Sequence, residues 1–481
     1  MTSVSDPVSA PVSDPGLSHP ALRAGVVGNG IDNIHVFLPV TALAPAMLVL
    51  AGPGAAASTG ALIMVAMLLG RPLGGIIFGR ISDRLGRTRT TRIAIAGTAA
   101  CALAIAVMPT HELLGPGTVA LILALRFIGG IFVAGEYSAA IPLAMEWSSG
   151  RRRGLMSGLI LSMAPWAQAT IAFSVAGLLA VLGPDQYAAW GWRLLFGIGA
   201  GLSIGMLIYY RRHVVDAPVF HRHAHQVRAT ETGNQGTAPN TGRTGMRALL
   251  MGRWAGAFWQ VFVMMTGLWL LTDTTVLLLT ERLSTDSGLN PTAVPVVMGL
   301  ASVAQAIVMA VAGHLSTGVG RRTLFLCWGA VAAVVGPGLW WLTVHAASWE
   351  MAAAGAAVLQ VVTVSAYGPV AAYLSERFPT AVRSTGYGAG YSLSLVLPAL
   401  YPFYLPWLEP LLGRHGSVMA LLSLGGVLLM IGAALGPRLG PGELDDDLDA
   451  VAYRSAGLAG PAAQPSPRMA SRGEPSISNT T

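Results

Sequence analysis

The stretch Gly79-Arg80-Ile81-Ser82-Asp83-Arg84-Leu85-Gly86-Arg87-Thr88-Arg89 is a short basic segment with a single acidic residue. An altered copy lies in the second half of the chain, as Gly313-His314-Leu315-Ser316-Thr317-Gly318-Val319-Gly320-Arg321-Arg322. Each copy follows an apolar run about one bilayer long and precedes another. A basic loop between two such runs is expected on the cytoplasmic side of a membrane. A repeat at this distance predicts two similar multi-helix halves.

The composition excludes a water-soluble globular protein. Hydrophobic residues make up 53% of the chain and charged residues only 11%, with a mean hydropathy of +0.60. A soluble domain is usually about 25% charged. The apolar runs are continuous, whereas a membrane β-barrel would show short alternating segments. The net charge of +7 comes from arginine alone and is concentrated in alternate loops, which indicates membrane topology and not nucleic-acid binding.

The apolar runs predict an all-α membrane protein with about twelve transmembrane helices in two pseudo-symmetric six-helix bundles. We place the spans at residues 25–50, 58–79, 92–110, 117–140, 154–182, 192–210, 254–280, 292–315, 323–344, 350–373, 384–407 and 416–436. Arginine-rich loops alternate with loops that carry little or no arginine, with Arg282 and Arg414 as minor exceptions. Both termini are therefore expected in the cytoplasm and the protein in the cell's inner (plasma) membrane. The predicted segments are a disordered tail (1–23), a first bundle (24–210), a central loop (211–253), a second bundle (254–437) and an acidic, then Pro/Ser-rich disordered tail (438–481).

A second repeat supports the duplication. Glu146 and Arg153 are seven residues apart after the fourth span, and Glu376 and Arg383 are seven apart after the tenth. A glycine follows each pair at an equivalent place. We interpret the two acid–arginine pairs as ion pairs that support a gate; solvated surface charges are the alternative.

The chain resembles the Major Facilitator Superfamily. Gly79, Asp83, Arg84, Gly86 and Arg87 match that superfamily's G-x-x-x-D-R-x-G-R loop between spans two and three. Within it, the sequence is most similar to the metabolite:proton symporter family, which moves small organic acids and zwitterions. The likeness rests on the stretches 126–137, 190–193, 216–220 and 375–386. The chain departs from that family where Asp32-Asn33-Ile34-His35 replaces Glu-Trp-Tyr-Asp, and Thr317 replaces an acid in the second loop.

We interpret the first loop as a cytoplasmic gate. Asp83 lies near a helix end, where a carboxylate accepts hydrogen bonds from arginine or from the N-terminus of a neighbouring helix. The resemblance implies that this neighbour is span eleven, which begins near Arg383. The simpler alternative is a loop whose arginines only set orientation. Thr317 predicts a weaker clasp in the second half.

Charged residues inside the spans are candidates for the substrate and proton pathway, because a charge within the bilayer is costly unless it faces a cavity or a partner. Asp32 or Glu136 is the expected proton site, and Arg126, which stays charged, is the expected substrate anchor or counter-charge. The alternative is a static ion pair. The candidates, with a histidine on the face of Asp32 and three tyrosines, are Asp32, His35, Arg126, Glu136, Tyr137, Asp273, Tyr367 and Tyr391.

These features predict proton-coupled symport of a small polar metabolite (an organic acid or zwitterion), without a cofactor, by a chain that would function as a monomer in the lipid bilayer. A proton-coupled exporter of drug-like or natural-product molecules is the alternative, although span five reads Met163-Ala164-Pro165-Trp166-Ala167 and lacks the exporters' glycine pattern. A sensor derived from a transporter is a further alternative. No constellation predicts an enzyme, ATP hydrolysis or a metal site. His221, His223 and His225 alternate in the central loop, and a solvated loop explains them better than a metal does.

Overall fold

The computed structural model describes residues 20–52, 56–217, 241–286 and 293–458, and these form helices, turns and short irregular links, without a β-strand. The first half contains α1 (Pro20–Ala42), α2 (Met47–Ala51), α3 (Ala56–Leu85), α4 (Arg87–Ala106), α5 (His111–Leu114), α6 (Gly117–Glu146), α7 (Gly150–Gln186) and α8 (Trp192–His213). The second half contains α10 (Thr241–Leu250), α11 (Ala255–Thr272), α12 (Leu279–Thr285), α13 (Ala293–Val319), α14 (Arg321–Val344), α15 (Trp349–Val364), α16 (Val370–Arg377), α17 (Arg383–Leu393), α18 (Val396–Ala399), α19 (Tyr401–Leu412), α20 (Arg414–Ala434) and α21 (Leu448–Ser455).

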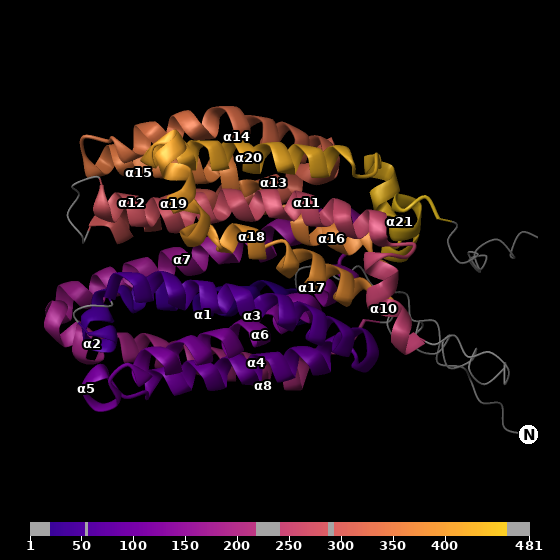
Figure 1. The fold of residues 1–481 in the computed structure, drawn as a ribbon. Coiled ribbons are helices and arrows are strands. Elements are labelled where there is room, and N and C mark those ends of the chain that lie inside the picture. The colour runs from indigo at the N-terminus through magenta and orange to yellow at the C-terminus, as the bar shows by residue number, and fades with distance from the viewer. Residues whose placement is uncertain (1–19, 53–55, 218–240, 287–292, 459–481) are drawn as a thin grey trace, which may run out of the picture.

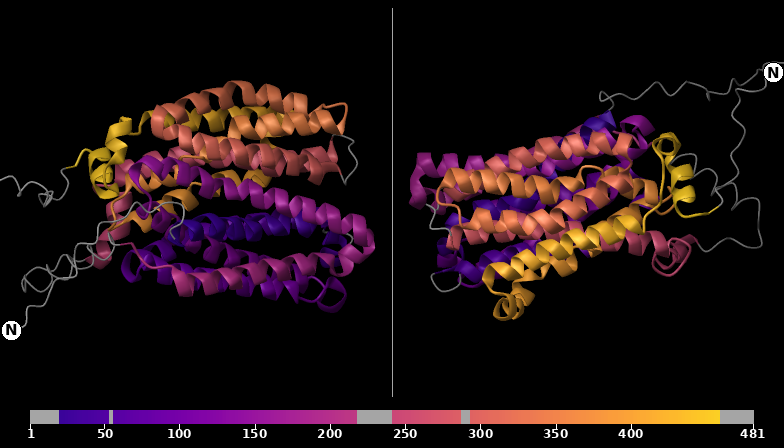
Figure 2. Two further views of the ribbon diagram at one scale, coloured as in Figure 1. Left: turned by 180° about the vertical axis from the view of Figure 1, so that it is seen from behind. Right: turned by 90° about the horizontal axis from the view of Figure 1, so that it is seen from above.

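The two halves form two layers of long, roughly parallel helices (Figure 1), and the layers remain distinct when the molecule is seen from behind (Figure 2). Two helix pairs make the main contacts between the layers: α7 with α13, and α3 with α17. This arrangement confirms the predicted fold class, because the duplicated sequence pattern has produced two bundles.

The predicted spans coincide with the helices, although not all of them meet a strict test of length and apolarity. Within the described residues, nine helical segments are long and apolar enough to cross a membrane, or ten with the bent pair Arg383–Ala399 and Tyr401–Leu412. One of the nine, Gly150–His213, is 64 residues long and contains two predicted spans, which separate at Gly183. The helix α4, at the predicted span 92–110, is not among them.

One end of the molecule carries both copies of the repeated loop, and we call it the gate end. Here α3 is joined to α4 by Gly86, with a φ of 96°, and α13 is joined to α14 by Gly320, with a φ of 89°. Residues with a Cβ rarely adopt this backbone conformation. The glycine in each sequence copy therefore serves the same sharp turn between two antiparallel helices.

The two layers touch through their backbones near the gate end. A Cβ on Gly158 of α7 would lie 2.6 Å from the carbonyl oxygen of Ala310 in α13. A Cβ on Gly75 of α3 would lie 2.4 Å from the carbonyl oxygen of Gly388 in α17. Small residues allow such close helix packing in membranes. The gate end is closed in this conformation.

The predicted tail 438–481 differs from the structure in its first part. Residues Pro441–Asp445 form a 3₁₀-helix and Leu448–Ser455 form α21, which packs at the gate end (Figure 1). The acidic composition suggested disorder, but Leu448, Val451 and Ala452 form a buried apolar face. Three parts of the predicted tails and loop lie outside the described residues. They are residues 1–19 of the predicted tail 1–23, residues 218–240 of the central loop and the tail after 458.

Candidate functional site

Asp83 holds the N-terminus of α17. Its Oδ1 accepts a hydrogen bond from the Ser384 backbone N–H at 3.0 Å, and its Oδ2 accepts from the Thr385 N–H at 2.9 Å and the Thr385 hydroxyl at 2.6 Å. A carboxylate at a helix N-terminus is stabilised by the exposed amide groups and by the helix dipole. Gly79 lies one turn earlier, where a Cβ would come within 2.7 Å of the Thr385 Cα. The expected contact between the first loop and span eleven is therefore present.

The acid–arginine pairs exchange partners between the two halves. Sequence spacing suggested Glu146 with Arg153 and Glu376 with Arg383, but Glu146 pairs with Arg383 at 2.7 Å and Glu376 pairs with Arg153 at 3.4 Å. Members of each sequence pair stand on either side of a turn, on the ends of two different helices. The pseudo-symmetry of the halves then brings each acid to the other half's arginine. These ion pairs connect the bundles.

Each of the two acids also forms an ion pair with a second arginine, which belongs to the acid's own half. Arg87 lies 3.0 Å from Glu146, and Arg321 donates to both oxygens of Glu376 at 2.5 and 2.6 Å. Arg87, at the start of α4, also lies 3.7 Å from Asp83, while Arg84 is exposed in the last turn of α3. Each copy of the loop thus contributes one buried arginine, Arg87 or Arg321, to the ion pairs inside the gate.

Within the described part of the chain, the second loop has no counterpart of the Asp83 contact. Thr317 stands at the equivalent position against α7, where its hydroxyl would lie 2.2 Å from a Cβ on Gly154. This hydroxyl is buried and has no hydrogen-bond partner among the described residues. The loop therefore packs against α7 without holding its N-terminus.

The segment that contains α21 covers the gate and contacts both halves. Asp449 accepts hydrogen bonds from the Thr380 N–H at 2.7 Å and from Arg383 at 2.5 Å, and Arg153 of α7 donates to the Leu444 carbonyl at 3.1 Å. Burial alone would raise the pKa of Asp449, but the positive charge of Arg383 and the hydrogen bonds of Thr380 outweigh it and lower that pKa. The carboxylate is thereby kept charged on the gate.

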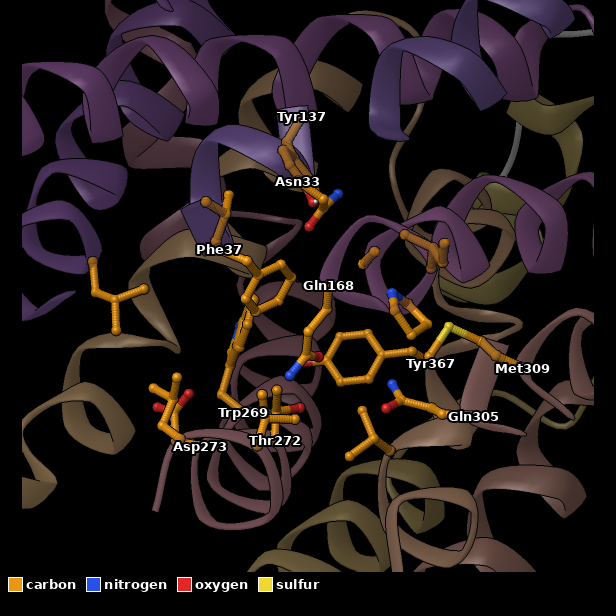
Figure 3. Close-up of a pocket in the computed structure, with 18 of the residues that line it drawn as sticks. Asn33, Phe37, Tyr137, Gln168, Trp269, Thr272, Asp273, Gln305, Met309 and Tyr367 are labelled. Atoms are coloured by element: carbon orange, nitrogen blue, oxygen red, sulfur yellow. Dashed lines mark hydrogen bonds between the residues drawn. The ribbon is translucent and has the colours of Figure 1, made fainter. Parts of the chain in front are cut away.

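The central cavity lies between the two halves (Figure 3). Both bundles contribute to its walls, which are mostly aromatic and aliphatic with a few polar side chains. This composition is typical of small-molecule sites. The polar and aromatic lining residues are Asn33, Phe37, Arg71, Tyr137, Gln168, Trp269, Thr272, Asp273, Gln305, Tyr367 and Tyr391. Of the predicted pathway residues, Tyr137, Asp273, Tyr367 and Tyr391 line it directly.

Arg71 of α3 is the cation of this cavity. Its guanidinium carbon lies 5.0 Å from the ring centre of Tyr137, 5.1 Å from that of Trp269 and 5.6 Å from that of Tyr391. Only 2% of the residue is exposed, and its Nε and Nη2 have no hydrogen-bond acceptor among the described residues. Cation–π contacts contribute about 0.5–2 kcal/mol, whereas a buried ion costs several kcal/mol without a counter-charge. The rings alone therefore do not compensate this charge.

Asp273 is the corresponding acid on the second half. It begins a π-helical turn, Asp273–Leu278, a form that is frequent at functional sites. The residue is 4% exposed, and its Oδ2 has no hydrogen-bond donor within the described ranges. Figure 3 shows it beside Trp269 and Thr272 at one side of the cavity, with Gln305 and Met309 on the opposite side. It forms no ion pair with Arg71.

Asp32 and Glu136 form a carboxyl pair inside the first half. The two carboxyl groups are close enough to interact directly, and the Glu136 Oε1 accepts a hydrogen bond from the Thr98 hydroxyl at 2.9 Å. Both residues are buried, with 5% and 3% of their surface exposed. Two carboxyl groups can share a hydrogen bond only when one of them carries a proton. The geometry is that of a proton-binding pair.

Arg126 and His35 lie elsewhere than the sequence suggested. Arg126 donates to the backbone carbonyls of His35 at 3.0 Å and Val36 at 3.4 Å and contacts the Met67 sulfur, so it braces α1 and does not line the cavity. The His35 ring hydrogen-bonds the Ser203 hydroxyl at 2.7 Å, toward α8. The cation that lines the cavity is Arg71. Sequence reasoning missed it, although an arginine inside the span 58–79 is the same signal that singled out Asp32.

The carboxyl pair and the cavity are adjacent along two helices. Asn33, next to Asp32 on α1, donates from its Nδ2 to the Tyr137 hydroxyl at 2.7 Å, and Tyr137 follows Glu136 on α6. Asn33 and Tyr137 both line the cavity. Any shift of α1 against α6 therefore changes the carboxyl pair and the cavity wall together.

The described residues contain no group of three or more His, Cys, Asp or Glu side chains that could hold a metal ion. His221, His223 and His225 of the central loop lie outside the described residues.

Known proteins resemble this chain along most of its length. A proline/betaine transporter of Escherichia coli (strain K12) is 26% identical over 350 residues, which cover 70% of this chain and 66% of that protein. An alpha-ketoglutarate permease of the same strain is 26% identical over 361 residues, covering 75% of this chain and 77% of the permease. Among solved structures, the proton:xylose symporter XylE bound to 6-bromo-6-deoxy-D-glucose has a TM-score of 0.69 at 18% identity, covering 86% of this chain and 94% of that one.

The family model of the Major Facilitator Superfamily matches residues 34–402, more than three quarters of the sequence. This match confirms the resemblance seen in the loop 79–89, and it places the chain among transporters and not among enzymes. The chain belongs to the Major Facilitator Superfamily.

Proposed function

We propose that the protein is a proton-coupled symporter that moves a small polar metabolite across the inner membrane by alternating access. The observation that carries this proposal is the buried Asp32–Glu136 carboxyl pair next to a cavity that both bundles line. Relatives named as a proline/betaine transporter and an alpha-ketoglutarate permease support a small polar substrate.

Proton coupling follows from the position of the carboxyl pair. A proton that binds the pair removes one buried negative charge, while loss of that proton leaves two carboxylates in contact, which repel each other. Repulsion would separate α1 from α6 and strain the Asn33–Tyr137 hydrogen bond on the cavity wall. Proton binding and cavity shape are thereby linked through two neighbouring residues on each helix.

Alternating access follows from the gate. The contacts of Asp83 with α17 and the two ion pairs between the halves hold the gate end closed, and all of them must break for that end to open. We propose that the gate end faces the cytoplasm and that one chain is sufficient, because one chain builds the whole cavity.

The test is uptake into proteoliposomes under an imposed inward proton gradient, with labelled amino acids, betaines, carboxylates and a neutral sugar. We expect gradient-dependent accumulation of at least one of them. Glu136→Gln should abolish accumulation but retain exchange of substrate across the membrane without a gradient, because the cavity is intact. The matched control is Glu112→Gln, at an exposed site in α5.

Two outcomes would contradict the proposal. The first is accumulation that does not depend on the gradient. The second is a Glu136→Gln variant that retains both the rate and the pH dependence of the unaltered protein. An outward gradient in the same vesicles tests the exporter alternative.

A further inference from the structure

A second cavity lies at the gate end, where α21 packs on the second bundle (Figure 1). We call it the gate-end cavity, and its volume is about 300 Å³. Its wall is built from the start of α14, the end of α16, the chain after α20 and the segment with α21. It shares no lining residue with the central cavity. The charged and hydroxyl-bearing residues of its wall are Arg321, Arg322, Tyr373, Glu376, Arg377 and Ser455.

Arg377, the last residue of α16, is the most isolated cation of this wall. Only 4% of the residue is exposed. Its Nη1 donates to the backbone carbonyl of Ser455 at 2.8 Å and to the Ser455 hydroxyl at 2.9 Å, both on α21. Its Nε is buried without a hydrogen-bond partner, and Arg377 forms no ion pair within the described residues. Two neutral oxygens do not offset the cost of burying a positive charge, so an anion in the cavity would stabilise this guanidinium.

The charges of the wall are out of balance. Glu376 is the one acid that lines the gate-end cavity in the described part of the chain, and it is already paired with two arginines. Arg321 donates to both of its oxygens, and Arg153 of the first half lies 3.4 Å from it. Arg322 donates instead to the Ala433 carbonyl at the end of α20, at 3.1 Å. The wall therefore carries three positive charges against one negative, a net charge of +2.

We propose that the gate-end cavity binds a phosphate group and that the bound anion fastens α21 against α16. A phosphate group carries a charge of about −1.5 to −2 at pH 7 and has three strong acceptor oxygens. This charge balances the wall, whereas one carboxylate would balance only half of it. The planar donors of arginine also suit phosphate oxygens. A soluble phosphate and the headgroup of an anionic lipid share this chemistry, and basic pockets between membrane helices take such headgroups.

The position of the cavity gives the bound anion a consequence for the gate. Ser455 of α21 already holds Arg377 of α16, and a phosphate on the same guanidinium would add to the contacts between these two helices. The segment with α21 also accepts a hydrogen bond from Arg153 of the first half, at the Leu444 carbonyl. An anion that keeps this segment docked therefore favours the closed gate end.

The test is titration of inorganic phosphate into the purified, delipidated full-length protein at constant ionic strength, followed by calorimetry. We expect saturable binding, with acetate about tenfold weaker because it carries a single charge. Hydrogen exchange of the backbone amides of Leu448–Ser455 should slow when phosphate is bound. A second arm uses the protein in phosphatidylcholine nanodiscs with and without phosphatidic acid. Loss of phosphate binding in the phosphatidic acid discs would assign the cavity to a lipid headgroup, and unchanged binding would assign it to a soluble anion.

Arg377→Gln should weaken phosphate binding roughly 10- to 100-fold, the usual effect of losing a charge-assisted contact, and should abolish the phosphate effect on hydrogen exchange. Arg377→Lys keeps the charge but not the planar donors and should give an intermediate affinity. The matched control is Arg454→Gln, which removes an exposed arginine of α21 that pairs with Asp446 and does not line the cavity. It should bind phosphate as the unaltered protein does. Should Arg377→Gln not unfold in a single thermal transition, Arg322→Gln decides, with an expected loss of about tenfold.

Three results would overturn the proposal. The first is the absence of saturable phosphate binding to the delipidated protein. The second is phosphate binding that survives Arg377→Gln unchanged, which would place the anion elsewhere, for instance beside Arg71 in the central cavity. The third is an equal loss of binding in Arg377→Gln and Arg454→Gln, which would reduce the effect to the general positive charge of this end. None of these results depends on which substrate the protein transports.

Discussion

The two copies of the gate loop have the same turn but hold their neighbours differently. In the first, Asp83 accepts three hydrogen bonds from the beginning of α17. In the second, the hydroxyl of Thr317 faces α7 without a partner. The second half compensates with shorter contacts to its acid, since Arg321 reaches both oxygens of Glu376 while Arg87 reaches one oxygen of Glu146. The first loop thus holds its neighbour mainly through the contact of Asp83 with a helix N-terminus. The second loop does so mainly through the ion pair of Arg321 with Glu376.

The largest effect is expected from the ion pair between Glu146 and Arg383, because both groups are fully buried and 2.7 Å apart. Glu146→Gln removes the acid that Arg87 and Arg383 share and leaves them only Asp83 at 3.7 Å and the partly exposed Asp449, so it should destabilise the closed gate by about 3 kcal/mol, the lower end of the usual cost of breaking a buried ion pair. The equivalent pair, Arg153 and Glu376, is longer at 3.4 Å and should show the smaller coupling energy in a double-mutant cycle. The measurement is the fraction of protein with a closed gate, from the distance between spin labels on α3 and α17. Equal coupling in the two cycles would contradict the asymmetry.

The next effect is expected from Asp83→Asn. Hydrogen bonds to a charged group contribute about 1.5–3 kcal/mol, so the variant should shift the equilibrium away from the closed gate and reduce uptake about tenfold or more. The protein should still reach the membrane in normal amount. Thr317→Val is the matched control in the second loop and should change uptake little, because the hydroxyl makes no hydrogen bond. Unchanged uptake in the Asp83 variant would remove its role in the gate.

The third prediction concerns the segment with α21, which contacts the gate residues of both halves. Asp449→Asn removes a partly exposed ion pair to Arg383 and should loosen the gate by about 1 kcal/mol. Because the docked pKa of Asp449 lies below its ordinary value of 3.8, its contribution is complete above that value and is lost only as the pH falls through the docked pKa. Uptake should therefore keep the same pH dependence between pH 5 and 8 in the variant. A changed profile in that window would assign the pH response to Asp449 instead of the Asp32–Glu136 pair.

The smallest effect is expected from Thr317→Asp, which places an acid where the first loop has one. A carboxylate near the N-terminus of α7 should stabilise the closed gate by about 0.3–1 kcal/mol. Uptake should slow slightly in the single variant, whereas in the Asp83→Asn background the same substitution should partly restore the closed gate and with it uptake. Faster uptake in the single variant would show that the two loops are not equivalent gates.

Several features of the fold could be read from the sequence because they depend on local patterns. Continuous apolar runs require helices in a membrane. The turns at Gly86 and Gly320 need glycine for their positive φ, whatever the packing of the helices that they join. The Asp83 contact was predicted from the motif and its position at a helix end. The tail was not, because the apolar face of α21 is only three residues within an acidic segment and needs a partner surface to be recognised.

The site residues show the limit of sequence reasoning more sharply. The sequence by itself determined which charges are buried in spans, since each of Asp32, Arg126, Glu136 and Asp273 interrupts an apolar run. Only the tertiary structure decided their partners. The pseudo-symmetry of the halves exchanges the acids and arginines of the gate, and the rotation of α6 turns Arg126 to the backbone of α1 while α3 turns Arg71 into the cavity. A one-dimensional pattern gives the burial of a charge, but the direction of a side chain around a helix buried on all sides is decided by packing.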